Sequence, residues 1–215
     1  RSAVPFQTAP DAMQRIVTGE GLDQTSYTET LMKAWKDRPA YSWSFEGLSL
    51  HHYIAPTNQP LMDSSTDFGE KEYAGLLDRS YSMDRMIVQH AAIMDKYDPD
   101  KKVAMVIDEW GAWLRPLPDT NFLFLRQQNS LRDALSAAIQ LNIFARHADR
   151  VRMANIAQMV NVIQAMILTD GPRMVLTPTY HAFAMYVPFQ DATAVPLKVS
   201  AGQYVSGTVR LPPIH

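Results

Sequence analysis

Two kinds of segment alternate along the first 178 residues of the chain. Short apolar or alternating runs predict β-strands, and longer runs with apolar residues at helical spacing predict α-helices. The predicted strands cover residues 14–18, 47–54, 103–108 and 151–155, and the predicted helices cover residues 27–36, 70–97 and 125–147. The run 103–107 is apolar throughout, as expected for a strand buried on both faces. The apolar segment 156–168 could open a further helix.

The order of these elements is a repeat of strand and helix. About four such units precede residue 178, and four units are half of an eight-fold barrel. The sequence therefore predicts an α/β fold that forms half of a (β/α)8 TIM barrel. After Pro178 the pattern changes: residues 179–211 alternate Tyr, Phe, Val and Thr with polar residues. This alternation predicts half-buried antiparallel strands.

The first candidate for chemistry is Asp108-Glu109-Trp110, which directly follows the apolar run 103–107. In a barrel of this kind, catalytic side chains lie at the carboxyl ends of the strands. Glu109 is a candidate nucleophile or general acid, with Trp110 and Trp113 as an apolar or a sugar-stacking surface. Paired carboxylates beside aromatic side chains are typical of glycoside hydrolases. The alternative is structural, because Asp108 and Glu109 could form an ion pair or cap the next segment.

A second predicted strand end carries His51, His52 and Tyr53. Because alternate residues of a strand point the same way, His51 and Tyr53 share a face and His52 points away from it. The His51 and Tyr53 side chains could hydrogen-bond a catalytic carboxylate, or they could form a buried pair satisfied by backbone groups. Two ligands on one face are too few for a metal site. The sequence predicts no metal ion and no cofactor.

The fourth predicted strand ends in an apolar run that contains three amide side chains. These are Asn155, Gln158 and Asn161. Burial of an amide is costly unless the amide is hydrogen-bonded, so each of them needs a partner. Sugar hydroxyls and loop backbone groups are equally suitable partners.

Composition narrows the classes of function. The 20 Lys and Arg against 22 Asp and Glu give a net charge of −2, which argues against a nucleic-acid partner and against a polybasic membrane anchor. The absence of cysteine excludes disulfides, a thiol nucleophile and thiolate metal sites, and it favours a cytoplasmic location. The apolar runs are far shorter than the roughly 20 residues of a membrane span. Neither a Gly-rich phosphate loop nor the Gly-x-Ser-x-Gly motif of serine hydrolases is present.

Several long segments resemble one family, in the same order and spacing. They are SLHHY (49–53), IDEWGAW (107–113), the stretch 126–167 that begins RQQNSLRDAL, and LTPTYHAFAMY (176–186). Over about residues 14–197 the chain resembles the C-terminal half of family 51 glycoside hydrolases, which are retaining α-L-arabinofuranosidases. The resemblance implies exo-acting hydrolysis of terminal α-L-arabinofuranosyl residues from arabinose-containing carbohydrates such as hemicellulose. It also implies assembly as a homo-oligomer.

The resemblance further implies roles for five side chains. Glu109 matches the catalytic nucleophile, which attacks the sugar and forms a covalent intermediate. Trp113 matches a tryptophan that lines the sugar pocket. His51 and Tyr53 match residues that contact the nucleophile and the substrate, and Gln158 matches a glutamine that binds the arabinose hydroxyls.

Two features depart from the family pattern. Gly111 follows the Asp-Glu-Trp motif, where many members have Asn. The family's general acid/base is a Glu in an Asn-Glu pair after the fourth barrel strand, and no such pair occurs in this sequence. We therefore expect a fragment that needs the N-terminal half of the barrel as its partner and is inactive alone. Residues 1–177 would form about the last four barrel units, and residues 178–215 the start of a C-terminal β-sandwich domain.

Two other functions fit the same residues. A half-barrel without a second carboxylate could be a non-catalytic sugar-binding module, which needs Trp113 and the amides but not Glu109. The complete barrel could instead be another retaining glycosidase that acts on β-xylosides or β-glucans. Hydrolysis of a panel of aryl glycosides separates these alternatives, because pocket shape rather than the carboxylates selects the sugar.

Overall fold

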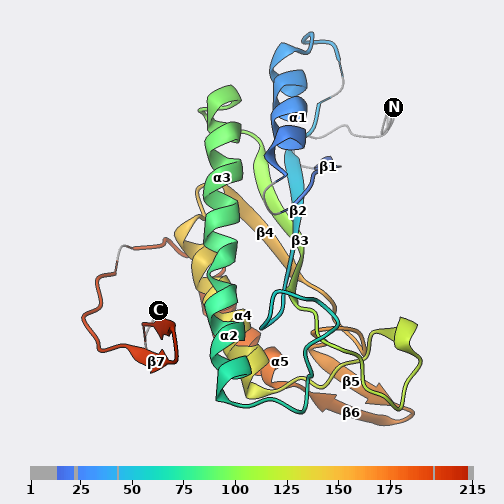
Figure 1. Cartoon of the computed structure of the whole chain (residues 1–215). Helices are drawn as coiled ribbons and strands as arrows, with labels where there is room; N and C mark the ends of the chain where they lie inside the picture. Colours follow the sequence, from blue (N-terminus) through green and yellow to red (C-terminus); the bar gives the residue numbers. More distant parts are fainter. Residues whose placement is uncertain (1–13, 22–23, 43, 196, 213–215) are drawn as a thin grey trace.

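The computed structural model describes residues 14–21, 24–42, 44–195 and 197–212. One sheet holds four parallel strands in the order β1 (Ile16–Thr18), β2 (Gly47–Ile54), β3 (Ala104–Ala112) and β4 (Val151–Ile156) (Figure 1). Along the chain the strands alternate with helices α1 (Thr25–Asp37), α2 (Glu70–Ser80), α3 (Ser82–Tyr97), α4 (Leu131–Arg146) and α5 (Pro178–Tyr186). The predicted α/β repeat with a parallel sheet is thus confirmed.

Two small antiparallel hairpins accompany this sheet. The first joins β5 (Ile167–Asp170) to β6 (Arg173–Leu176), and the second joins β7 (Tyr204–Ser206) to β8 (Val209–Leu211). Two short 3₁₀ helices, η1 (Phe122–Phe124) and η2 (Val187–Phe189), lie in the connections. In the part of the chain that the structure describes, no helix is long and apolar enough to cross a bilayer.

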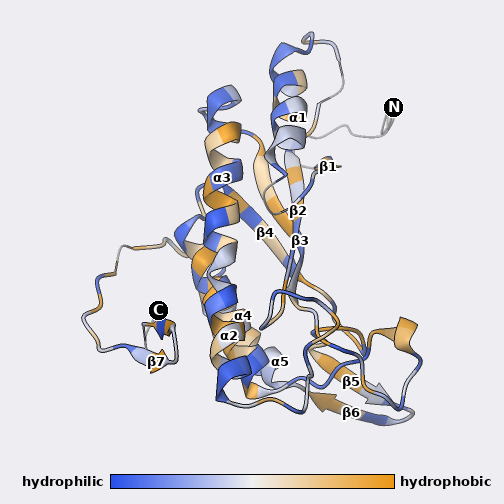
Figure 2. Ribbon diagram, viewed as in Figure 1, coloured by the Kyte–Doolittle hydropathy of each residue, from blue (hydrophilic) through white to orange (hydrophobic). Residues whose placement is uncertain are grey.

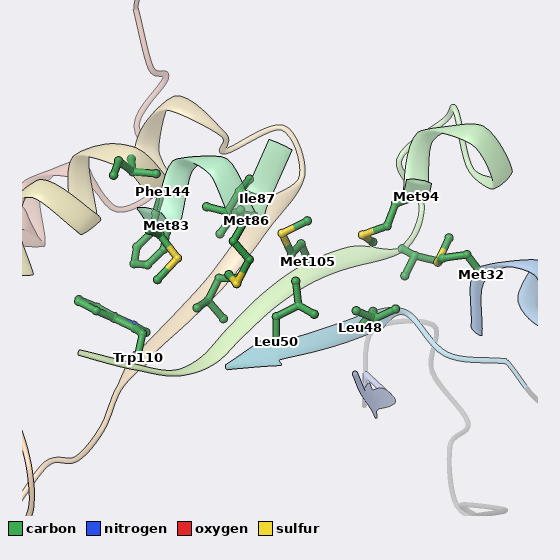
Figure 3. Packing of buried hydrophobic residues seen from close by; sticks show 14 of the residues in the cluster. Met32, Leu48, Leu50, Met83, Met86, Ile87, Met94, Met105, Trp110 and Phe144 are labelled. Carbon is green, nitrogen blue, oxygen red and sulfur yellow. The ribbon is translucent and has the colours of Figure 1, made fainter. Parts of the chain in front are cut away.

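The main core lies between one face of the sheet and the helices. Leu48 and Leu50 of β2 and Met105 and Ile107 of β3 are all fully buried, because alternate residues of each strand point toward the helices. The methionines of α1 and α3 pack against them (Figure 3). Figure 2 shows hydrophobic and hydrophilic positions alternating along α3, as expected for a helix with one side on a sheet. The opposite face of these strands therefore carries other side chains, including some at the carboxyl ends of the strands.

The predicted helix 70–97 is two helices that meet at Tyr81. The serine hydroxyls on either side of Tyr81 both bond to backbone carbonyls about one turn earlier: Ser80 Oγ to Leu76 O at 3.0 Å and Ser82 Oγ to Arg79 O at 2.6 Å. Such hydroxyls compete with the helical ladder and bend or interrupt helices. The apolar spacing continues across the break, which is why the pattern alone predicted one helix.

The predicted helix 125–147 begins later, because α4 starts at Leu131. Ser130 and Asp133 form a capping box, in which the Ser130 N–H and hydroxyl donate to Asp133 Oδ2 at 2.8 and 2.6 Å. This local motif sets the first turn. Residues 125–130 instead run without helical structure and place polar side chains among the neighbouring loops.

Two predictions for the C-terminal third are wrong. The segment 156–168 does not open a helix but forms a loop that leads into β5, and residues 178–186 form α5 rather than a strand. The start of α5 has a local cause, because Thr177 Oγ1 accepts the Tyr180 N–H at 3.4 Å and Pro178 fits the first helical turn. Among the described residues of 179–211, antiparallel strands occur only at β7 and β8. The division into a barrel portion and a sandwich portion at residue 177 stays a prediction.

A buried ion pair closes the end of the sheet opposite the strand carboxyl ends. Arg150 and Asp98 are 2% and 1% exposed, and Arg150 Nη1 lies 3.0 Å from Asp98 Oδ2 and donates to Val103 O at 2.9 Å. Burial alone would raise the pKa of Asp98, but the Val103 and Lys102 backbone N–H groups and Arg150 outweigh it and lower that pKa. The ionised pair therefore ties the start of β4 to the turn after α3.

Removing one partner of this pair is expected to destabilise the fold. We predict that Arg150→Met lowers the free energy of unfolding by about 3–5 kcal/mol, because it leaves the Asp98 carboxylate buried without its cation. The exposed Arg152 is the matched control, and Arg152→Met should cost less than about 1 kcal/mol. Denaturant unfolding measures both values. Equal losses in the two variants would show that the buried pair is not what stabilises this end of the sheet.

Candidate functional site

The candidate site lies where β2 and β3 end, and a β-bulge shapes it. Ser49 pairs with Val106 but His51 pairs with Glu109, so β3 contains one extra residue between these two pairs. In a regular strand Asp108 and Glu109 would point to opposite faces. A bulge bends the strand and turns side chains, and bulges are frequent next to active sites. Here it lets both carboxylates reach the same imidazole.

His51 bridges the two carboxylates. Its Nε2 lies 3.1 Å from Asp108 Oδ1, and its Nδ1 lies 3.5 Å from Glu109 Oε2. Tyr53, two residues further along β2, donates its hydroxyl to the same Glu109 Oε2 at 2.9 Å. His51, Tyr53 and Glu109 are thus brought together, which is the first of the two arrangements that the sequence left open for His51 and Tyr53. His52 points the other way, as predicted: it is 2% exposed and its Nε2 lies 2.7 Å from Ser82 Oγ.

The electrostatics of the site keep Tyr53 a hydrogen-bond donor. Burial, the hydrogen bond to Glu109 and the nearby carboxylate charges all raise the pKa of Tyr53 above its ordinary value. The phenol therefore stays protonated further into the alkaline range than an ordinary tyrosine does. The Glu109 side chain is 44% exposed, so a carboxylate held through one oxygen remains open to a ligand. This arrangement suits a nucleophile or a base.

The two tryptophans have different surroundings. Trp113 is partly exposed, and its ring centroid lies 4.8 Å from that of Tyr53, so the two rings form an aromatic wall beside Glu109. Trp110 is fully buried, with its ring centroid 5.1 Å from that of Phe144 (Figure 3). The ring centroid of Phe183 lies 5.9 Å from that of Trp110. The expectation that Trp110 offers a sugar-stacking surface is therefore wrong, because the residue after Glu109 faces the core.

Asn161 and Gln158, in the loop after β4, make different hydrogen bonds. Asn161 is structural, because its Nδ2 donates to Thr169 Oγ1 at 2.9 Å and its Oδ1 accepts the Thr169 N–H at 2.8 Å. Gln158 is exposed and lies in the loop that follows β4, the strand next to β3. Its described hydrogen bond is made by its backbone N–H, which donates to Val162 O at 3.3 Å. No described contact joins the Gln158 side chain to Glu109, so its role stays a prediction.

Three buried amides support the site and were not singled out from the sequence. They are Gln127, Asn129 and Gln164, which are 3%, 4% and 1% exposed. Gln164 Nε2 donates to Asp133 Oδ1 at 3.1 Å, and its Oε1 accepts from Asn129 Nδ2 at 3.3 Å. A signal was present: residues 126–130 are a polar run inside a segment of apolar periodicity, and a cluster of this kind indicates a loop.

Gly111 occupies a backbone conformation that other residues avoid. Its φ is +134°, and a Cβ there would lie 3.0 Å from Gln164 Cγ. We predict that Gly111→Ala lowers the free energy of unfolding by about 1–3 kcal/mol, because of backbone strain and this contact. Gly202 is the control, since a Cβ at that position meets nothing within 4 Å and Gly202→Ala should be neutral. Thermal or denaturant unfolding checks both, and a neutral Gly111→Ala would contradict the assigned conformation.

Metal ligation is not indicated by the geometry of the described residues, in which no group of three or more His, Asp or Glu side chains is placed to hold an ion. The site's own groups are two carboxylates, an imidazole, a phenol and an indole. These groups lie on two adjacent strands and the loop after the second.

Comparison with known proteins identifies the chain's relatives. Residues 108–211 match the family model described as the alpha-L-arabinofuranosidase C-terminal domain. An intracellular exo-α-L-arabinofuranosidase of Bacteroides ovatus is 41% identical over 186 residues, which are 86% of this chain and 35% of that protein. The crystal structure of the GH51 arabinofuranosidase of Xanthomonas axonopodis pv. citri is 52% identical, with a TM-score of 0.88, over 98% of this chain and 42% of that one.

A more distant structure has the same fold. The family 51 α-L-arabinofuranosidase of Bifidobacterium longum is 19% identical, with a TM-score of 0.69, over 93% of this chain and 41% of that one. The chain thus spans well under half the length of each of these relatives. The resemblance seen in the sequence motifs is confirmed: over this part of their length, the chain is similar in sequence and fold to family 51 α-L-arabinofuranosidases.

Proposed function

We propose that the chain is the nucleophile-bearing part of a retaining, exo-acting α-L-arabinofuranosidase, with Glu109 as the nucleophile. The observation that carries this proposal is the position of Glu109, at a strand carboxyl end with Tyr53 2.9 Å from one carboxylate oxygen. A nucleophile must be ionised, oriented and accessible. The Tyr53 hydrogen bond and the His51 contact orient the carboxylate, and the 44% exposure of the side chain leaves it accessible.

The proposed reaction has two displacements. The Glu109 carboxylate attacks the anomeric carbon of the terminal arabinofuranosyl unit while a second carboxylic acid protonates the departing oxygen. A covalent glycosyl-enzyme forms, and water then attacks it with the second group acting as base, so the product keeps its configuration. In retaining enzymes the two carboxyl groups lie about 5–5.5 Å apart. The second group is proposed to come from the N-terminal half of the barrel.

This proposal includes the architecture and surroundings of the whole enzyme. The four parallel strands would be half of a (β/α)8 barrel, closed by the N-terminal half, and residues 178–215 would lead into the C-terminal β-sandwich. Trp113 would line the sugar pocket and Gln158 would bind arabinose hydroxyls. A homo-oligomer acting on hemicellulose carbohydrates is proposed. A cytoplasmic location is supported by the Bacteroides ovatus relative, whose name calls it intracellular.

The test is a panel of aryl glycosides applied to the full-length protein. We expect rapid release of the aryl group from the α-L-arabinofuranoside and little from the β-xyloside or β-glucoside. Proton NMR of the first-formed sugar should show retained configuration, and residues 1–215 alone should be inactive. Preference for a β-xyloside or a β-glucoside would favour the other retaining glycosidases. Binding of sugar without any hydrolysis would favour a sugar-binding module.

A further inference from the structure

Gln127 pairs with the backbone on both sides of Trp113. Its Oε1 accepts the Leu114 N–H at 2.8 Å, and its Nε2 donates to Ala112 O at 2.9 Å. The residue is 3% exposed, so these hydrogen bonds are shielded from water. A primary amide presents an acceptor and a donor side by side. The Gln127 side chain thus hydrogen-bonds to the end of β3 and to the residues after β3, as the backbone of a neighbouring strand would.

The strand pairing of the sheet explains why the Gln127 amide is needed in place of a neighbouring strand. On the side of β2, pairing with β3 continues as far as Ile54 and Ala112, whereas on the side of β4 it ends at Trp110 and Ile156. The peptide groups of residues 112–114 continue past that last pair. Buried backbone groups must be hydrogen-bonded, and a strand that has lost its neighbour leaves them unpaired. The Gln127 amide fills this gap, and at Ala112 O it is joined by Gln164 Nε2, which donates at 3.3 Å.

The backbone of Trp113 itself is also fixed. Its N–H donates to Ile54 O at 2.9 Å, and its carbonyl accepts the Leu61 N–H at 3.2 Å. With the two hydrogen bonds from Gln127, consecutive peptide groups are fixed on both sides of the indole. The Trp113 ring then lies 4.8 Å from Tyr53, whose hydroxyl donates to Glu109. A short path of contacts therefore leads from Gln127 to the carboxylate.

We propose that Gln127 is a positioning residue that sets the place of the Trp113 indole in the sugar pocket. The inference rests on the proposed function, because the indole's place matters only where it contacts substrate. Gln127 does not touch the reacting atoms and acts through Trp113. A displacement of about 1 Å in a positioned group can cost roughly a hundredfold in rate. Loss of the amide should therefore reduce catalysis more than it reduces stability.

The experiment is a double-mutant cycle in the full-length enzyme. Gln127→Met, which keeps length and removes both hydrogen bonds, should lower kcat/KM on an aryl α-L-arabinofuranoside by about tenfold to hundredfold. In a Trp113→Phe background the same change should have a much smaller effect, because coupled residues are not additive. Gln140→Met is the matched control: Gln140 is a fully buried glutamine of α4 bonded to Ser136, and its loss should leave kcat/KM unchanged.

Several results would overturn the inference. They are an unchanged kcat/KM in Gln127→Met, an equal loss in Gln140→Met, or effects of Gln127 and Trp113 that simply multiply. If Gln127→Met does not fold, Gln127→Glu replaces it in the same cycle, because this variant keeps the acceptor for the Leu114 N–H. A wild-type enzyme inactive on every arabinofuranoside would contradict the proposed function instead, so the two failures are distinguishable.

Discussion

Glu109→Gln in the full-length protein is expected to reduce kcat on an aryl α-L-arabinofuranoside by at least about a thousandfold, because the amide cannot form the glycosyl-enzyme. The fold should survive, since the substitution is nearly isosteric and the side chain is 44% exposed. Steady-state kinetics and thermal unfolding of the same preparation give both values.

The control for this substitution is Glu29→Gln. Glu29 also accepts a tyrosine hydroxyl, that of Tyr97 at 2.8 Å, but it lies on α1, away from the strand carboxyl ends. Its substitution should leave kcat unchanged. Near-normal turnover in Glu109→Gln, with the fold intact, would refute the assignment of Glu109 as nucleophile. A small anion such as azide should restore aryl release in Glu109→Ala by attacking in place of the carboxylate.

Tyr53→Phe is expected to lower kcat/KM by about tenfold to hundredfold. The change removes the hydroxyl that donates to Glu109 Oε2 at 2.9 Å, and hydrogen bonds to charged groups contribute roughly 1.5–3 kcal/mol. Tyr97→Phe is the matched control, because it removes the same kind of hydroxyl–carboxylate contact at Glu29. Loss of activity in Tyr97→Phe as large as in Tyr53→Phe would contradict a specific role for Tyr53.

The pH dependence of the Tyr53→Phe effect follows from the raised pKa of Tyr53. Burial is the largest cause, and the hydrogen bond to Glu109 adds to it. Because both favour the protonated phenol, Tyr53 should remain a donor as the pH rises through the ordinary tyrosine range near about 10. The ratio of wild-type to Tyr53→Phe activity should therefore stay constant over that range. A ratio that falls toward one at alkaline pH would show that Tyr53 ionises normally.

The parallel sheet could be predicted because its signals are local and strong. Each strand is a short apolar run, and each helix between them has apolar residues at helical spacing. Helix boundaries were less predictable, because hydroxyl and capping contacts set them. Ser80 and Ser82 interrupt one helix, and the Ser130–Asp133 capping box starts another. In α5, Thr177 and Pro178 were the start signals, and the aromatic alternation after them masked a helix.

The site could be predicted only in part. The two-residue period of a strand is enough to place His51 and Tyr53 together and His52 in the core, and the structure confirms this. The bulge in β3 depends on pairing between strands, so the shared contact of both carboxylates with His51 was not predictable. The Gln127 amide was missed for the same reason, because its partners are backbone groups at the end of β3 and just after it.

The most direct test of the central claim is to trap the intermediate. The full-length enzyme is quenched in acid during turnover of an activated, slowly released α-L-arabinofuranoside, digested, and analysed by mass spectrometry. We predict a covalent pentosyl adduct on the peptide that contains Glu109, with fragmentation placing it on that side chain and no adduct in Glu109→Gln. An adduct on another carboxylate, or inverted product with no adduct during active turnover, would contradict the account.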